Sequence, residues 1–136
     1  MSGAVLVDSC VILDVIAGST EWAEWSARML QEVAASGEIC VNPIIFAEVS
    51  IGFAEVQDVA EALDTLDFHY ADLPWDAAFL AGKAFLRYRR EGGERRSPLP
   101  DFYIGAHALV AGMTLLTRDA RRYRRYFPRL ALLTPE

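Results

Sequence analysis

The sequence contains few of the residues that build disulfide frameworks or zinc sites. Its 136 residues include two cysteines and two histidines, with no CxxC pair and no cluster of cysteine with histidine. A structural zinc site is therefore not expected. Cys10 and Cys40 both lie within apolar runs, so we predict free thiols in a reducing cytosol and no disulfide.

Long apolar runs and a basic leader are also missing. No run approaches the roughly 20 residues that cross a bilayer, and no basic residue precedes the first apolar run at Ala4. We therefore predict a cytoplasmic protein with no membrane span and no secretory signal. The sequence shows no internal repeat, low-complexity tract or domain boundary, so residues 1–136 are expected to form a single domain around one core.

Basic residues are scarce in the first part of the chain. Residues 1–80 contain 14 acidic residues and one basic residue, Arg28, whereas residues 81–136 contain 12 basic and five acidic residues. The net charge of −6 hides this polarity, and all but one of the bases are arginine. Arginine suits planar recognition of phosphate or carboxylate. The later part of the chain is therefore expected to offer an anion-binding surface.

Apolar runs of strand length alternate with helical patterns. Strands are expected at residues 4–7, 38–41, 69–73, 113–117 and 130–133. Helices are expected at residues 9–17, from a cap at Ser19 or Thr20 to 36, 43–53, 55–66, 74–90, 101–110 and 119–127, with a loop at 91–100. This alternation predicts an α/β fold, a three-layer sandwich in which helices cover both faces of a central parallel sheet of four or five strands.

Four acidic residues are expected to meet at one edge of this sheet. Asp8 ends the first strand, and Asp119 follows the strand at 113–117. Asp101 begins the helix before that strand, and Glu48 lies in the helix after the second strand. Ligands of such sheets bind at the edge where the strands end. Clustered carboxylates raise each other's pKa, and a divalent cation relieves the repulsion.

The chemistry of this cluster points to hydrolysis of a phosphodiester. Carboxylate oxygens without histidine or cysteine favour Mg²⁺ or Mn²⁺ over zinc. A metal held by a few carboxylates keeps several waters, and it can activate one of them and neutralise charge on a phosphate. The residues alone therefore predict a metal-dependent phosphodiester hydrolase.

Each acid also has a simpler interpretation. Asp8 could cap the helix that follows it, and Asp101 and Asp119 could do the same or simply favour a helix N-terminus. Glu48 is harder to explain in this way, because it interrupts an apolar helix face where an uncompensated carboxylate is costly. His107 lies two turns along its helix from Asp101, and we expect it to be packed or hydrogen-bonded and not a ligand.

Four motifs occur in order along nearly the whole chain. They are Val7–Ile12, Phe46–Val49, Leu99–Ala108 and Leu115–Asp119. In order and spacing they closely resemble the PIN domain, specifically the VapC-type toxins of bacterial toxin–antitoxin pairs. Two positions depart from the family pattern: Cys10 stands where many members have Asn or Ser, and arginines 121 and 122 lie where some members carry a further acid.

The resemblance implies a sandwich of helices around a parallel sheet and Mg²⁺- or Mn²⁺-dependent endoribonuclease activity. It also implies a homodimer that is inhibited by a cognate VapB-type antitoxin. The family's acidic positions, which are its catalytic and metal-binding residues, are matched by Asp8, Glu48, Asp101 and Asp119. Its small polar positions lining the site are matched by Ser9 and Thr117, which we expect to contact the RNA substrate.

Six arginines lie between Arg118, within the last motif, and Arg129. Arg118 adjoins Asp119, and we expect it to bind an RNA phosphate. For the others, RNA contact, contact with an antitoxin and a solvated helix face all stay open. The three tryptophans have helical spacings typical of core or dimer contacts, and they are Trp22, Trp25 and Trp75.

Three other functions fit part of the pattern. A receiver-like signalling domain needs paired acids after the first strand and a lysine near the site, but Lys83 is the only lysine and lies within a long helix. A phosphatase with a nucleophilic Asp8 usually has a second acid two residues later, where this chain has Cys10. An inactive PIN-like module that only binds a partner is the third alternative, and the complete set of acids argues against it.

Overall fold

The computed structural model describes residues 3–135, and one parallel five-stranded sheet lies at the centre of this part. The strands are β1 (Val5–Val7), β2 (Ile39–Val41), β3 (His69–Tyr70), β4 (Thr114–Leu116) and β5 (Leu132–Leu133). Their order across the sheet is β3-β2-β1-β4-β5, and every neighbouring pair is parallel. The predicted parallel sheet is confirmed, with five strands.

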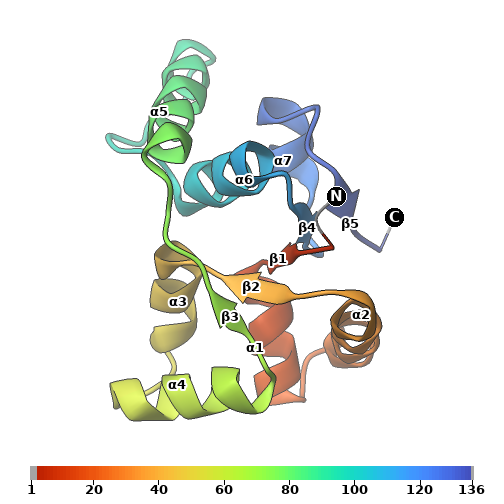
Figure 1. The fold of residues 1–136 in the computed structure, drawn as a ribbon. Coiled ribbons are helices and arrows are strands. Elements are labelled where there is room, and N and C mark those ends of the chain that lie inside the picture. The colour runs from red at the N-terminus through yellow and green to blue at the C-terminus, as the bar shows by residue number, and fades with distance from the viewer. Residues whose placement is uncertain (1–2, 136) are drawn as a thin grey trace.

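Seven helices connect these strands within the described residues. They are α1 (Ser9–Ala17), α2 (Ala23–Ser36), α3 (Pro43–Ser50), α4 (Val56–Thr65), α5 (Trp75–Arg90), α6 (Pro100–Ala111) and α7 (Arg121–Tyr126). Figure 1 shows α1 to α4 on one side of the sheet and α5 to α7 on the other. The predicted three-layer α/β/α sandwich is therefore confirmed. No helix of residues 3–135 is long and apolar enough to cross a membrane.

The strand order marks a particular place on the sheet. The chain proceeds from β1 through β2 to β3 along one face, and then returns to β4 and β5 on the other side of β1. The order thus reverses between β1 and β4, whose residues pair as Leu6 with Leu115. In open α/β sheets, ligands bind beyond the carboxyl ends of the strands at this reversal. Asp8 and Thr117 are the first residues beyond those two ends.

The same order excludes one alternative from the sequence. Receiver-type domains arrange their strands as 2-1-3-4-5, whereas the order here is 3-2-1-4-5. The receiver-like interpretation is therefore wrong.

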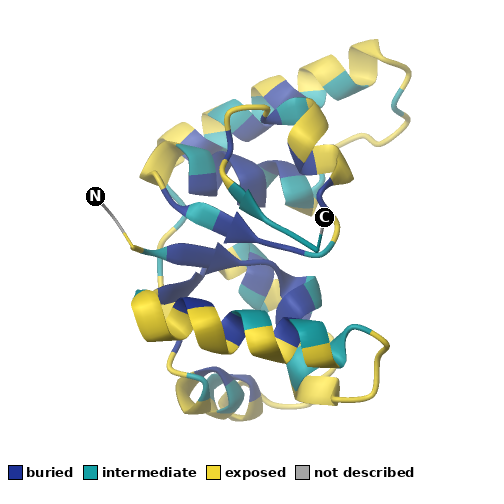
Figure 2. Cartoon of the chain, turned by 90° about the vertical axis from the view of Figure 1, so that its right-hand side faces the viewer, coloured by how far each residue is buried: buried dark blue, intermediate teal, exposed yellow. Residues whose placement is uncertain are grey.

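The central strands are buried from both sides, as expected for a parallel sheet covered by helices. Leu6 and Val7 in β1, and Leu115 and Leu116 in β4, have no exposed surface. Figure 2 shows buried residues of the helices turned toward the sheet and exposed residues turned outward. The two strands that end at the site are thus held rigidly by packing on both faces.

Several element boundaries differ from the predictions. The helix expected from a cap at Ser19 or Thr20 begins at Ala23, because the Thr20 hydroxyl donates to Asp14 and accepts from the Trp22 N–H. The strand expected at 69–73 ends at Tyr70, and the helix expected to reach residue 53 ends at Ser50. The helix expected from 119 begins at Arg121. The helix expected at 9–17 is found with the same bounds, and the other elements differ by one or two residues at their ends.

Candidate active site

Asp8 lies at the centre of the site, directly after β1. It is the N-cap of α1, where its Oδ1 accepts from the Ser9 N–H at 2.8 Å. Its Oδ2 accepts from the Thr117 hydroxyl at 2.8 Å and from the Tyr123 hydroxyl at 2.9 Å. The residue is 6% exposed and forms no ion pair with any residue of the described range 3–135. Capping is therefore confirmed for Asp8, but it leaves a buried carboxylate without a cation.

The surroundings of Asp8 make its negative charge costly. Burial and the nearby charge of Asp101 raise its pKa from 3.8 to about 6, and the charge of Glu48 adds to the effect. The hydroxyls of Thr117 and Tyr123 oppose this shift but do not cancel it. The structure therefore brings Asp8, Asp101 and Glu48 close enough to repel one another, as the sequence predicts.

Glu48 reaches the site from α3. Its Oε1 accepts from the Ser9 hydroxyl at 2.8 Å, so the side chain turns toward the start of α1. Burial raises the pKa of Glu48 against the effect of this hydrogen bond, and the charge of Asp101 raises it further. Ser9, which was expected to contact substrate, holds Glu48 in this structure.

Asp101 lies in the first turn of α6 and is not its cap, since the N-cap is Leu99. Its Oδ1 accepts from the Tyr123 hydroxyl at 3.3 Å, and its Oδ2 pairs with Arg122 Nη1 at 3.1 Å. The side chains of Arg122 and Asp101 are 43% and 29% exposed. Asp101 is thus the outer neighbour of Asp8, with a cationic partner at the rim of the site.

Asp119 is the outermost of the four acids. It is exposed and lies between β4 and α7, and its backbone N–H donates to the Thr117 hydroxyl at 3.1 Å. The N-caps of α6 and α7 are Leu99 and Ala120, so capping is wrong for Asp101 and Asp119, although Asp101 does lie in the first turn of its helix, where an acid is favoured. Asp119 and Asp101 line the same hollow of about 280 Å³. Thr117 itself has no exposed surface, and its hydroxyl serves Asp8 and the backbone of Asp119.

The four acids suit a hard divalent cation, although they do not form a preassembled ligand set. Among residues 3–135, no group of three or more acidic, histidine or cysteine side chains is arranged so that it could hold a metal ion as it stands. Ser9 holds Glu48, and Arg122 holds Asp101. However, a buried Asp8 with a raised pKa and no cationic partner is what an oxygen-binding cation would stabilise. Asp8, Glu48, Asp101 and Asp119 are the residues that would hold it.

A second buried carboxylate, Asp14 of α1, escaped the sequence analysis. It is 1% exposed and accepts two hydrogen bonds from Arg118, at 2.7 and 3.1 Å. The Ser26 hydroxyl donates to it at 2.8 Å and the Thr20 hydroxyl at 3.0 Å. Burial alone would raise its pKa, but these partners outweigh burial and lower it. The one feature of the sequence that could have indicated this residue is its position within the apolar stretch from Val11 to Ala17.

This network gives Arg118 a role that its position beside Asp119 did not suggest. The guanidinium is bound to Asp14 in a two-point contact, the geometry that arginine and carboxylate favour. Arg118 therefore anchors the segment between β4 and α7, which carries Thr117 and Asp119, to helix α1. The proposed contact between Arg118 and RNA stays a prediction.

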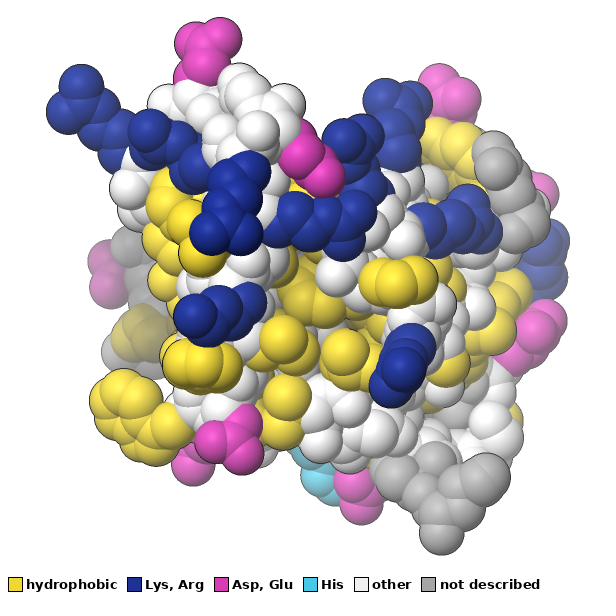
Figure 3. Space-filling view, turned by 90° about the horizontal axis from the view of Figure 1, so that it is seen from above, with side chains coloured by type: hydrophobic (Ala, Val, Ile, Leu, Met, Phe, Trp, Pro, Cys, Tyr) yellow, Lys and Arg dark blue, Asp and Glu magenta, His cyan; other side chains and the backbone are white. Residues whose placement is uncertain are grey.

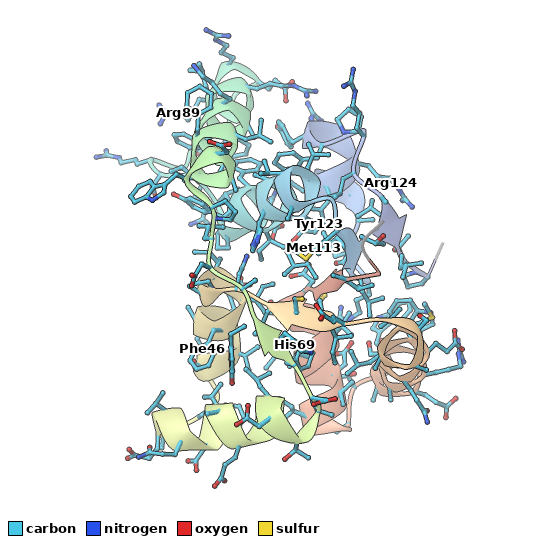
Figure 4. All side chains as sticks on the ribbon, in the orientation of Figure 1. Phe46, His69, Arg89, Met113, Tyr123 and Arg124 are labelled. Atoms are coloured by element: carbon cyan, nitrogen blue, oxygen red, sulfur yellow. The ribbon has the colours of Figure 1, made fainter. Side chains whose placement is uncertain are left out.

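Tyr123 of α7 also escaped the sequence analysis. It is 1% exposed, and its hydroxyl lies within hydrogen-bonding distance of both Asp8 and Asp101. Figure 4 shows it between α7 and the sheet. Gly105 of α6 allows this approach, because a Cβ there would lie 2.6 Å from the Phe127 ring and 3.1 Å from the Tyr123 ring. An aromatic residue amid arginines gives no sequence signal that its hydroxyl reaches the site.

The remaining residues that the sequence singled out are placed as follows. His107 is buried, and its Nδ1 lies 3.0 Å from Asn42 Nδ2, so the prediction of a bonded histidine is confirmed. Both cysteines are free, as predicted. Trp75 is 90% exposed and so is not a core residue. Trp22 and Trp25 pack edge to face and are half-buried.

Comparisons with known proteins agree with this architecture. A family model of the PIN domain matches residues 5–128. The structure is similar to a chain of VapBC2 from Rickettsia felis bound to a promoter DNA fragment, with a TM-score of 0.74 and 18% identity over 98% of this chain and 99% of that one. It is also similar to a chain of DNA-bound VapBC from Salmonella typhimurium, with a TM-score of 0.69 and 19% identity over 98% of both chains.

A third similar structure is that of FitAcB from Neisseria gonorrhoeae, with a TM-score of 0.70 and 20% identity over 96% of this chain and 97% of that one. At these identities the likeness concerns the fold. A comparison with curated proteins finds no match.

Proposed function

Because the chain belongs to the PIN domain family, we propose that it is a Mg²⁺- or Mn²⁺-dependent endoribonuclease that acts as the toxin of a toxin–antitoxin pair. The observation that carries this proposal is Asp8. Its carboxylate is buried beyond β1 at the point where the strand order reverses, and it has acidic neighbours and no cationic partner among residues 3–135. This is the environment of a metal ligand.

The residues of the site have two roles: some hold the carboxylates in place, and others line the open side of the site. Ser9, Thr117 and Tyr123 fix the carboxylates of Glu48 and Asp8 by hydrogen bonds. Asp101 and Asp119 line the open side, where a phosphate would enter. When bound, a divalent cation supplies an activated water and neutralises charge on the phosphate. Ser9 stays a candidate substrate contact, because its hydroxyl lies at the same edge as Glu48.

The family and the exposed apolar surface of α5 support two kinds of partner, an antitoxin and a second copy of the chain. The similar chains come from structures of VapBC and of a toxin–antitoxin complex, which supports a VapB-type partner for this chain. Trp75 and Phe79 are 90% and 68% exposed on α5, and Leu86 lies on the same side of the helix at 42%. Exposed apolar groups of this size mark interaction surfaces. We therefore propose a homodimer or an antitoxin contact there, which size measurement of the purified chain with and without its partner can test.

The direct test is cleavage of a labelled RNA by the purified chain, freed of any antitoxin. We expect cleavage with Mg²⁺ or Mn²⁺, none with EDTA, and a loss of about a hundredfold or more for Asp8→Asn, since the variant removes a metal-bound charge. Glu61→Gln, an exposed glutamate of α4, is the matched control and should cleave like the parent. Parental cleavage by Asp8→Asn would reject the site. Binding of a partner without any cleavage of RNA by the parent chain would favour the inactive module.

A further inference from the structure

Two hollows open on either side of Asp119. The larger, about 700 Å³, is called here the Trp22 hollow and is lined by Trp22, Asp119, Arg121, Arg124 and Thr134, among others. The smaller one, of about 280 Å³, contains Asp101 and Asp119. Asp119, Arg121 and Arg125 line both. The acidic site therefore continues into a larger space beyond Asp119, and that space has no part in the site described above.

The charge of the Trp22 hollow comes from one face of α7. Arg121 and Arg124 are three residues apart and therefore lie on the same side of the helix. Arg118 and Arg125 also border the hollow, but their guanidinium groups pair with Asp14 and Glu91. Arg121 forms no ion pair with any residue of the range that the structure describes. Figure 3 shows the wider concentration of arginine and lysine over the face formed by α5 to α7.

The hollow also has an aromatic wall. Trp22 is half-buried, and its ring is steadied by an edge-to-face contact with Trp25 at a centroid distance of 6.1 Å. Aromatic rings beside cationic side chains are the elements by which proteins hold single-stranded nucleic acid, with bases stacked and phosphates paired. A volume of about 700 Å³ falls within the range of pockets that hold small ligands, about 300–1,000 Å³.

We propose that the Trp22 hollow binds one nucleotide of the RNA strand beside the scissile phosphate, with Arg121 and Arg124 on its phosphate and Trp22 against its base. The proposal rests on the proposed ribonuclease function. An acidic peptide of a partner protein would pair with the arginines, but its carboxylates would not stack on the indole ring. RNA satisfies both, and a strand cut at the acids must also pass Asp119, which borders the hollow.

The test is binding of a fluorescein-labelled single-stranded RNA in EDTA, where no cleavage occurs, read by anisotropy at several salt concentrations. Arg121→Gln/Arg124→Gln should weaken binding about tenfold at 0.1 M salt. It should also reduce the salt slope by about 0.7, because the two arginines neutralise one phosphate and each neutralised phosphate contributes about 0.7 to the slope on a single strand. The matched control is Arg89→Gln/Arg90→Gln. It removes two exposed charges at the C-terminal end of α5, where Arg89 lies away from Arg124 (Figure 4), and should change neither value.

Trp22 is tested separately. Trp22→Leu should weaken binding about tenfold without changing the salt slope, because stacking of one base on an aromatic ring contributes about that factor. Trp22→Phe keeps a ring and should retain most of the affinity, which separates stacking from loss of packing. Circular dichroism melts check that each variant is folded.

Three results would overturn the proposal. The first is RNA binding by Arg121→Gln/Arg124→Gln equal to that of the parent. The second is an unchanged affinity in Trp22→Leu. The third is that Arg121→Gln/Arg124→Gln no longer binds a glutamate-rich peptide that the parent binds, while its RNA binding is intact. This result would assign the hollow to a protein partner. If the parent cleaves RNA in any of these cases, only the hollow is wrongly assigned, whereas a parent that neither binds nor cleaves RNA removes the proposed function as well.

Discussion

Asp8 and Asp14 stand near the two ends of helix α1, and both carboxylates are buried, at 6% and 1% exposure. Asp14 is held by Arg118, Ser26 and Thr20, and its pKa is lowered. Asp8 accepts three hydrogen bonds but has acidic neighbours, and its pKa is raised to about 6. One aspartate has its counter-charge within the protein, and the other lacks it.

This difference separates a structural role from a functional one. A buried carboxylate with a complete set of partners stabilises the arrangement around it, and here Asp14 ties α1 and α2 to the segment before α7. A buried carboxylate that keeps an unfavourable charge persists where a ligand compensates it. Burial alone, which the two residues share, distinguishes neither role.

The largest effect is expected on the structural side of this comparison. Asp14→Ala should lower the free energy of unfolding by about 3 kcal/mol, because it leaves the guanidinium of Arg118 without its partner in a partly buried position. Urea unfolding measures this, with Glu61→Ala as the exposed control. A double variant that also carries Arg118→Met should lose less than the sum of the single changes. A loss below about 0.5 kcal/mol would mean that the pair is no more than a surface ion pair.

Asp8 should destabilise the folded chain at neutral pH, whereas Asp14 stabilises it. The pKa of Asp8 is higher in the folded chain, so its contribution to stability is complete below about pH 3.8 and is lost as the pH rises through about 6. At pH 7 the cost is about 3 kcal/mol, from two pKa units at about 1.4 kcal/mol each. Unfolding in EDTA between pH 4.5 and 7.5 should therefore favour Asp8→Asn increasingly over the parent. Parallel curves for the two proteins would contradict the raised pKa.

A smaller effect is expected from the hydroxyl that joins two of the acids. Tyr123→Phe keeps the ring against Gly105 but removes the hydrogen bonds to Asp8 and Asp101. We expect about tenfold weaker Mn²⁺ binding, since groups that orient metal ligands contribute at least that factor. Tyr70→Phe is the matched control, because its hydroxyl donates to Asp64 of α4 and to none of the four acids. Equal affinities in the two variants would show that Tyr123 does not position the ligands.

The sequence predicted the sheet and the convergence of the acids because both depend on simple periodic features. Short apolar runs that alternate with helical patterns determine the order of layers, and an acid placed just after a buried strand must lie at the edge of the sheet. Asp8 follows from the second rule directly, and Asp101 and Glu48 follow because the helices that carry them begin at the same edge.

The partners of the acids could not be predicted in the same way. The contacts of Asp14 with Arg118 and of Tyr123 with Asp8 join residues more than 100 positions apart. They depend on side-chain directions that no local pattern specifies. The start of α2 was misplaced for a related reason, since the Thr20 hydroxyl serves a tertiary contact with Asp14 as well as the local turn.

Metal-induced stabilisation distinguishes Asp8 as a metal ligand from Asp14 as a structural residue. Melting of the parent, Asp8→Asn and Asp14→Asn is measured in EDTA and in Mn²⁺. A ligand that binds only the folded state at 100 times its Kd adds about 2.7 kcal/mol. We predict this gain for the parent and for Asp14→Asn, which starts from a lower melting temperature, and none for Asp8→Asn. An equal gain in Asp8→Asn, or its loss only in Asp14→Asn, would contradict this assignment of the two residues.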